Sequence, residues 1–129
     1  MRVLNIEDGP AKHRAIKDVL ESCRVFDVDC ERNLDDGVTR YKEALAAGNP
    51  YDLIITDMWY SPERGAGEQR CGDKLIEMAG REHWDVPIVI CSNQDYSNYP
   101  GIFGSLHYSE NVDWEGQLRE YVDKINKKR

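Results

Sequence analysis

The stretch YDLIITDMWY, residues 51–60, is the part of the sequence that best indicates the fold. Leu53 to Thr56 form a short, mostly apolar run that ends at Asp57, after which the chain turns polar and glycine-rich. A continuously apolar strand is typical of a parallel sheet whose two faces are both covered. A carboxylate at its end is a helix cap, a solvated loop residue or a reactive group, and the flanking sequence has to distinguish these.

Strand-like and helix-like segments alternate on both sides of this stretch. Strands are predicted at residues 2–6, 24–30, 52–56, 86–91 and 104–108. Helical spacing of apolar residues predicts helices after Pro10, after a capping Asn33, around residues 75–80, and from Asp113 onward. Between residues 92 and 104, Pro100 and Gly101 limit any helix to about one or two turns. This alternation predicts parallel strands joined by crossover helices.

Composition excludes several classes of protein. The 129 residues fit one domain, expected to span 1–129, and the net charge of -7 argues against a nucleic-acid-binding surface. No apolar run approaches the length of a membrane span, and no signal peptide is visible, so we expect a cytoplasmic protein without membrane contact. The four cysteines form no C-x-x-C pair and lack histidines at zinc-ligand spacing, so we expect reduced thiols.

Polar residues follow the first, third and fourth predicted strands. These are Glu7 and Asp8, then Asp57, then Ser92. Sites in parallel sheets lie beyond the carboxyl ends of the strands, so we expect these side chains to converge. Carboxylates this close repel one another, and a hard divalent cation such as Mg²⁺ compensates that repulsion best. The alternative interpretation of Asp8 is that it caps the first helix, with Pro10 near the first helical position.

Four motifs in order resemble the receiver domain of bacterial two-component response regulators. They are NIEDG (5–9), DLIITDM (52–58), GDKLIEM (72–78) and VPIVICS (86–92), and the resemblance covers essentially the whole chain. It implies a flavodoxin-like (βα)5 sandwich, an α/β fold with five parallel strands in the order 2-1-3-4-5. In this chain the fourth helix would be shortened or absent.

The resemblance also implies a function and a set of site residues. Asp57 matches the aspartate that accepts a phosphoryl group from a histidine kinase or a phosphotransfer protein. Glu7 and Asp8 match the acidic pair that binds Mg²⁺ together with Asp57, and Trp59 matches the position whose main-chain carbonyl completes the metal site. Ser92 matches the switch hydroxyl. The implied protein is a signalling receiver, not an enzyme beyond Mg²⁺-dependent self-phosphorylation and slow autodephosphorylation. A downstream protein or a second copy of the chain would be its further partner.

Three positions depart from the family pattern. The family places a lysine at the end of the fifth strand, where Tyr108 stands here, and no lysine lies between Lys74 and Lys124. Asn93 replaces the small residue that usually follows the switch hydroxyl, and Ser105 replaces an aromatic residue of the fifth strand. These departures leave an alternative open, namely a pseudo-receiver that binds proteins without being phosphorylated. A magnesium-dependent hydrolase is a third, less supported class, since no second carboxylate closely follows Asp57.

The long loop after Asp57 suggests a substitute for the missing lysine. It contains Arg64 and Arg70. We hypothesise from the sequence that either arginine reaches back over the site and supplies the positive charge.

Overall fold

A computed structural model describes residues 1–128 of the chain. Over these residues the strands and helices alternate along the chain, except that the fourth and fifth strands follow one another without a helix between them. Their bounds are β1 (Arg2–Ile6), α1 (Pro10–Ser22), β2 (Asp27–Glu31), α2 (Leu34–Ala46), β3 (Leu53–Thr56), α3 (Cys71–Arg81), β4 (Ile88–Ser92), β5 (Gly104–His107) and α4 (Trp114–Lys127). No helix among residues 1–128 has the length and apolar character needed to cross a bilayer.

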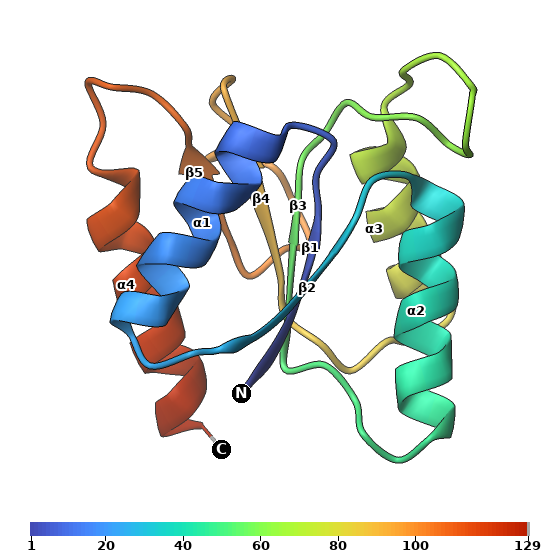
Figure 1. Cartoon of the computed structure of the whole chain (residues 1–129), viewed down its shortest axis with the longest axis horizontal. Helices are drawn as coiled ribbons and strands as arrows, with labels where there is room; N and C mark the ends of the chain where they lie inside the picture. Colours follow the sequence, from blue (N-terminus) through green and yellow to red (C-terminus); the bar gives the residue numbers. More distant parts are fainter. Residues whose placement is uncertain (129) are drawn as a thin grey trace.

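The strands form one parallel sheet in the order β2-β1-β3-β4-β5. Figure 1 shows the sheet between two helical layers, with α1 and α4 on one face and α2 and α3 on the other. The predicted flavodoxin-like α/β fold and its strand order are therefore confirmed. β3 lies at the centre, so Asp57 emerges from the middle of the sheet edge.

The apolar run of β3 serves both faces of the sheet. Leu53 and Ile55 are fully buried against the helices α1 and α4, whereas Ile54 is fully buried on the side of α2 and α3. Successive strand side chains point to opposite faces, so a strand covered on both sides has to be apolar at every position. This explains why the sequence of β3 lacks the alternation of a half-exposed strand.

One predicted strand starts later than expected, and the segment after β4 takes one of its two expected forms. β2 begins at Asp27, not Arg24, and Phe26 just before it is 69% exposed. Residues 93–103 contain turns and bends but no helix, so the fourth helix is absent, not shortened. Gly101 has a left-handed φ of 77° there, and Phe103 N–H already donates to Ile88 O at 2.9 Å. The chain thus returns directly into the sheet beside β4.

Candidate functional site

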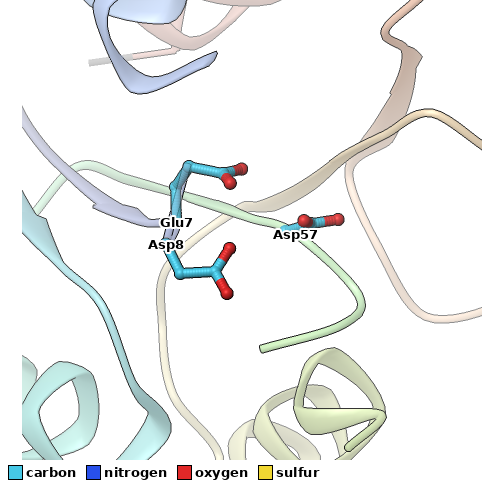
Figure 2. A group of neighbouring side chains, drawn as sticks. All are labelled: Glu7, Asp8 and Asp57. Atoms are coloured by element: carbon cyan, nitrogen blue, oxygen red, sulfur yellow. The ribbon is translucent and has the colours of Figure 1, made fainter. Parts of the chain in front are cut away.

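Three carboxylates meet at the carboxyl edge of the sheet. Glu7 and Asp8 follow β1, and Asp57 follows the neighbouring β3. Each contributes an oxygen to a group within 4.8 Å of one another. Figure 2 shows the Glu7 and Asp8 carboxylates extending from the end of β1 towards the side on which Asp57 lies. The Asp57 N–H donates to Ile6 O at 3.1 Å, so the β1–β3 pairing continues past the strands and holds the acids together.

The main chain around these acids orients them. Glu7 is 4% exposed, and its Oε2 accepts a hydrogen bond from Gly9 N–H at 2.9 Å. Asp57 Oδ1 accepts one from Met58 N–H at 2.7 Å. Gly9 is the N-cap of α1, and no side chain caps this helix. The alternative interpretation of Asp8 as a helix cap is therefore wrong, and its carboxylate belongs to the acidic group.

A lysine that the sequence analysis missed supplies the positive charge at this site. Lys12 lies in the first turn of α1, and its side chain is 13% exposed. Its Nζ lies 2.9 Å from Glu7 Oε1 and 3.3 Å from Asp57 Oδ2, and it donates to Cys91 O at 2.5 Å. One ammonium therefore contacts the ends of β1, β3 and β4. Helical side chains lean towards the helix N-terminus, which aims Lys12 back over the strand ends.

Burial and charge act in opposite directions on these groups. Burial raises the pKa of Glu7 above its ordinary value, and Lys12 offsets this only in part. Burial acts to lower the pKa of Lys12, but its interactions with Cys91, Glu7 and Asp57 outweigh burial and raise that pKa. Burial also raises the pKa of Cys91 to about 12, so this thiol is uncharged at neutral pH.

The residues present fit a Mg²⁺ ion. Glu7 Oε1 is buried and faces the Lys12 ammonium at 2.9 Å. Three carboxylates with one ammonium leave net negative charge, and all the available ligand atoms of this group are oxygens. Mg²⁺ prefers such hard oxygen ligands and typically takes one or two carboxylates from a protein. Glu7, Asp8 and Asp57 are the side chains that would hold it.

An open cavity of about 480 Å³ gives access to this group. Glu68 is an exposed residue of the long loop, and a hydrogen bond with Asp8 raises the pKa of Glu68. Trp59 is 42% exposed at the same cavity. The position of its carbonyl as a metal ligand stays a prediction. The cavity is lined by Asp8, Lys12, Asp57, Trp59, Glu68, Asn93 and Tyr108.

The ends of β4 and β5 contribute different chemistry. Ser92 is 1% exposed, and its hydroxyl accepts a hydrogen bond from Gln94 N–H at 3.2 Å. Tyr108 N–H donates to Ser92 O at 2.7 Å, which places the Tyr108 ring at the cavity. The ring packs on Trp114 with centroids 5.1 Å apart and lies 5.7 Å from Lys12 Nζ. Tyr108 therefore lines the same cavity as Asp8 and Asp57, and it does so with an aromatic ring.

Solved structures resemble the whole chain, whereas neither a protein-family model nor a curated protein matches its sequence. A response regulator receiver domain from Clostridium thermocellum is 22% identical with a TM-score of 0.68, covering 98% of this chain and 95% of that one. The receiver domain of a putative Luxo repressor protein from Vibrio parahaemolyticus is 14% identical with a TM-score of 0.72, covering 98% and 90%. TrrA from Thermotoga maritima, in complex with Mg²⁺ and BeF, is 22% identical with a TM-score of 0.67, covering 96% and 97%. The chain has the receiver-domain fold.

Within this receiver fold, the charge near Asp57 comes from a helix and not from β5. Tyr108 is the first residue after β5, where the resemblance predicts a lysine, and the ammonium in contact with Asp57 belongs to Lys12 of α1. The sequence carried a signal for this contact. Lys12 comes four residues after Asp8, in the first turn of a helix that Pro10 starts.

The arginines of the long loop are paired elsewhere. Arg64 donates to Asp36 at 3.0 Å, and its side chain is 86% exposed. Arg70 donates to Asp73 at 2.6 Å and lies over the Trp59 ring, 5.8 Å from its centroid. The hypothesis that one of them supplies the charge at Asp57 is therefore wrong for this structure.

Ser105 stands in β5 where the resemblance predicts an aromatic residue, and Tyr121 packs beside it. Tyr121 of α4 donates its hydroxyl to Ser105 O at 3.1 Å, and its ring packs edge-on against Phe103 at 5.6 Å. His107 Nε2 lies 3.1 Å from Asn93 O, so it binds the main chain after β4. The β5 edge is therefore held by α4 and by the β4–β5 loop.

Proposed function

We propose that this chain is a receiver in a two-component phosphorelay, and that Asp57 accepts a phosphoryl group in the presence of Mg²⁺. The observation that carries the proposal is the group of Glu7, Asp8 and Asp57 oxygens within 4.8 Å of one another at the centre of the sheet edge. The receiver-domain fold supports it. Chemistry at Asp57 requires an open approach, and the cavity of about 480 Å³ provides one.

The chain's own residues account for the transfer step. One Asp57 carboxylate oxygen attacks phosphorus, a P–O bond forms, and the P–N bond to the donor histidine breaks. A carboxylate is anionic at neutral pH, so this nucleophile requires no general base. Met58 N–H holds Asp57 Oδ1 at 2.7 Å and so fixes the plane of the carboxylate. Bound Mg²⁺ supplies the charge neutralisation that phosphoryl transfer needs.

The donor in this proposal is a histidine kinase or a histidine phosphotransfer protein. A histidine kinase takes its phosphoryl group from ATP, which is made inside cells, so a cytoplasmic location is part of the proposal; the bacterial origin in it rests on the resemblance to bacterial response regulators. Ser92 is the proposed switch hydroxyl, although it is almost fully buried in the described structure. Phosphorylation would then change the affinity for a downstream protein or for a second copy of the chain.

Beryllofluoride, a stable stand-in for the phosphoryl group, provides the test. The full chain is mixed with Mg²⁺ and beryllofluoride while tryptophan fluorescence is followed, and separately with Mg²⁺ and acetyl phosphate before intact-mass measurement. We expect a Mg²⁺-dependent fluorescence change and the mass of one added phosphoryl group. Asp57→Asn should lose both. Since the chain has three tryptophans, Trp59→Phe is the control that assigns the fluorescence signal.

One result of these experiments would contradict the phosphorylation proposal. If neither reagent produces a Mg²⁺-dependent change, and Asp57→Asn behaves like the parent chain, the phosphorylation proposal fails. The remaining interpretation would then be a protein-interaction module that works without phosphate.

A further inference from the structure

We propose that Lys12 binds a phosphoryl oxygen on Asp57, taking from α1 the role that the receiver family assigns to a lysine at the end of β5. This inference rests on the proposed function, because it concerns the phosphorylated form of the same site. It assigns the charge-neutralising side chain to an element that the family resemblance does not indicate.

The first argument is reach. Lys12 Nζ lies 3.3 Å from Asp57 Oδ2, and both residues line the same cavity. A phosphoryl group on Asp57 adds negative oxygens beyond this carboxylate, on the cavity side. The carboxylate itself loses its charge when it becomes an acyl phosphate. The attraction that holds the ammonium near Oδ2 therefore moves outward to the phosphoryl oxygens.

The second argument is the anchoring of Lys12. Its side chain is 13% exposed and donates to Cys91 O at 2.5 Å while contacting Glu7 at 2.9 Å. The ammonium is therefore held in place before any phosphoryl group arrives, which lowers the cost of orienting it. An ammonium has three donors, so it can keep contacts with the strand ends while it binds a new oxygen.

The third argument concerns the other candidates. Tyr108 stands where a lysine is expected, but its ring packs on Trp114 and faces Lys12, and a phenol carries no positive charge. Arg64 and Arg70 are paired with other aspartates. Within residues 1–128, Lys12 is the cation that makes an ion pair with Asp57.

A rival role for Lys12 makes the opposite prediction. In that role the ammonium simply occupies the place of the metal and keeps the acids from repelling each other. Removing it would then tighten Mg²⁺ binding and leave the affinity for a phosphoryl analogue unchanged or higher. In our proposal, removing it weakens binding of the analogue even when the metal is saturating.

The experiment compares Lys12→Gln with the parent chain at saturating Mg²⁺. We expect Lys12→Gln to weaken beryllofluoride binding about 10- to 200-fold, the effect of losing one charged hydrogen bond. Lys12→Arg should recover most of it. Lys17→Gln, the same change on the same helix, is the matched control and should bind like the parent. Circular dichroism and Mg²⁺ titration of each variant establish that the site is still formed.

A second variant distinguishes the loss of the positive charge from damage to the fold by Lys12→Gln. Tyr108→Lys is added to Lys12→Gln, which moves the charge from α1 to the end of β5. We expect this double variant to bind beryllofluoride more tightly than Lys12→Gln alone. Unchanged affinity in Lys12→Gln would overturn the Lys12 inference while the proposed function stands. If the parent chain itself does not bind beryllofluoride, the proposed function fails, and the inference fails with it.

Discussion

The two halves of the sheet edge differ in what they bring to the site. The ends of β1 and β3 carry the acids Glu7, Asp8 and Asp57, with oxygens within 4.8 Å of one another. The ends of β4 and β5 bring a buried hydroxyl at Ser92 and the ring of Tyr108, without a charged side chain. The charge that would balance the acids comes from α1. The positive charge that balances a group of acids does not have to follow a strand of the sheet. A helix that begins close to the acids can supply it.

The two halves of the sheet edge also differ in how rigid the atoms packed against them are. Near Asp57, Gly72 at the start of α3 packs directly against the main chain after β3. A Cβ on Gly72 would lie 2.7 Å from Asp57 O. Near β5, a Cβ on Gly104 would meet the tip of the Tyr121 ring. Main chain in a sheet edge moves less easily than a ring, so the acidic half is the more rigid one.

Gly72→Ala should have the largest effect on stability. The new Cβ would lie 2.7 Å from Asp57 O and 2.9 Å from Met58 Cα, which are both main-chain atoms. We expect a loss of about 3 kcal/mol in the free energy of unfolding, measured by urea denaturation. Gly80→Ala is the control on the same helix, with no atom within 4 Å of its Cβ. It should be neutral or slightly stabilising, and an equal loss in both variants would contradict the rigid-half interpretation.

Lys12→Met should have the next largest effect, and it should depend on metal. Without Mg²⁺ the variant leaves Glu7, which is 4% exposed, facing Asp57 without a counter-ion. We expect the free energy of unfolding to fall by about 2 kcal/mol, below the full cost of breaking a buried pair. Saturating Mg²⁺ should reduce the loss, because without the ammonium the cation has no competitor for Glu7 and Asp57 and so stabilises the variant more than the parent. Thermal denaturation with EDTA and with Mg²⁺ measures this. A loss that is the same in both would show that Lys12 acts only by packing.

Gly104→Ala should have a smaller effect than Gly72→Ala. The Tyr121 ring can move away from the new methyl group, at the expense of its hydrogen bond to Ser105 O. We expect a loss of about 1 kcal/mol in the free energy of unfolding. Tyr121→Phe separates the lost hydrogen bond from the displaced ring. A loss in Gly104→Ala as large as that in Gly72→Ala would mean that the β5 half is equally rigid.

Arg64→Ala should have the smallest effect. The Arg64 side chain is 86% exposed, and exposed ion pairs contribute little. The loop is held instead by main-chain hydrogen bonds, from Leu34 N–H to Ser61 O and from Asp35 N–H to Pro62 O, each 3.0 Å long. We expect no measurable change in the melting temperature or in beryllofluoride affinity. Weakened beryllofluoride binding would instead indicate that Arg64 supplies positive charge at Asp57.

Much of the fold was predictable because it depends on local patterns. The apolar run of β3, the cap Asn33 and the start of the last helix at Asp113 were predicted from the sequence. Asn33 accepts a hydrogen bond from its helix as expected, and Asp113 accepts one as well. The segment 93–103 was harder, because Pro100 and Gly101 limit a helix without excluding one. Its return into the sheet through Phe103 N–H is a long-range contact, which local propensity does not encode.

The sequence by itself determined that Glu7, Asp8 and Asp57 lie together, because each directly follows an apolar strand of a parallel sheet. It did not determine which cation faces them. Lys12, Arg64 and Arg70 all lie in segments adjacent to the acids along the chain, and local propensity does not rank their reach. The tertiary structure decided this, since the first turn of α1 starts at the end of β1 and directs Lys12 to within 3.3 Å of Asp57. The sequence specifies which side chains carry charge, but the distance between these charges depends on how the helices pack on the sheet.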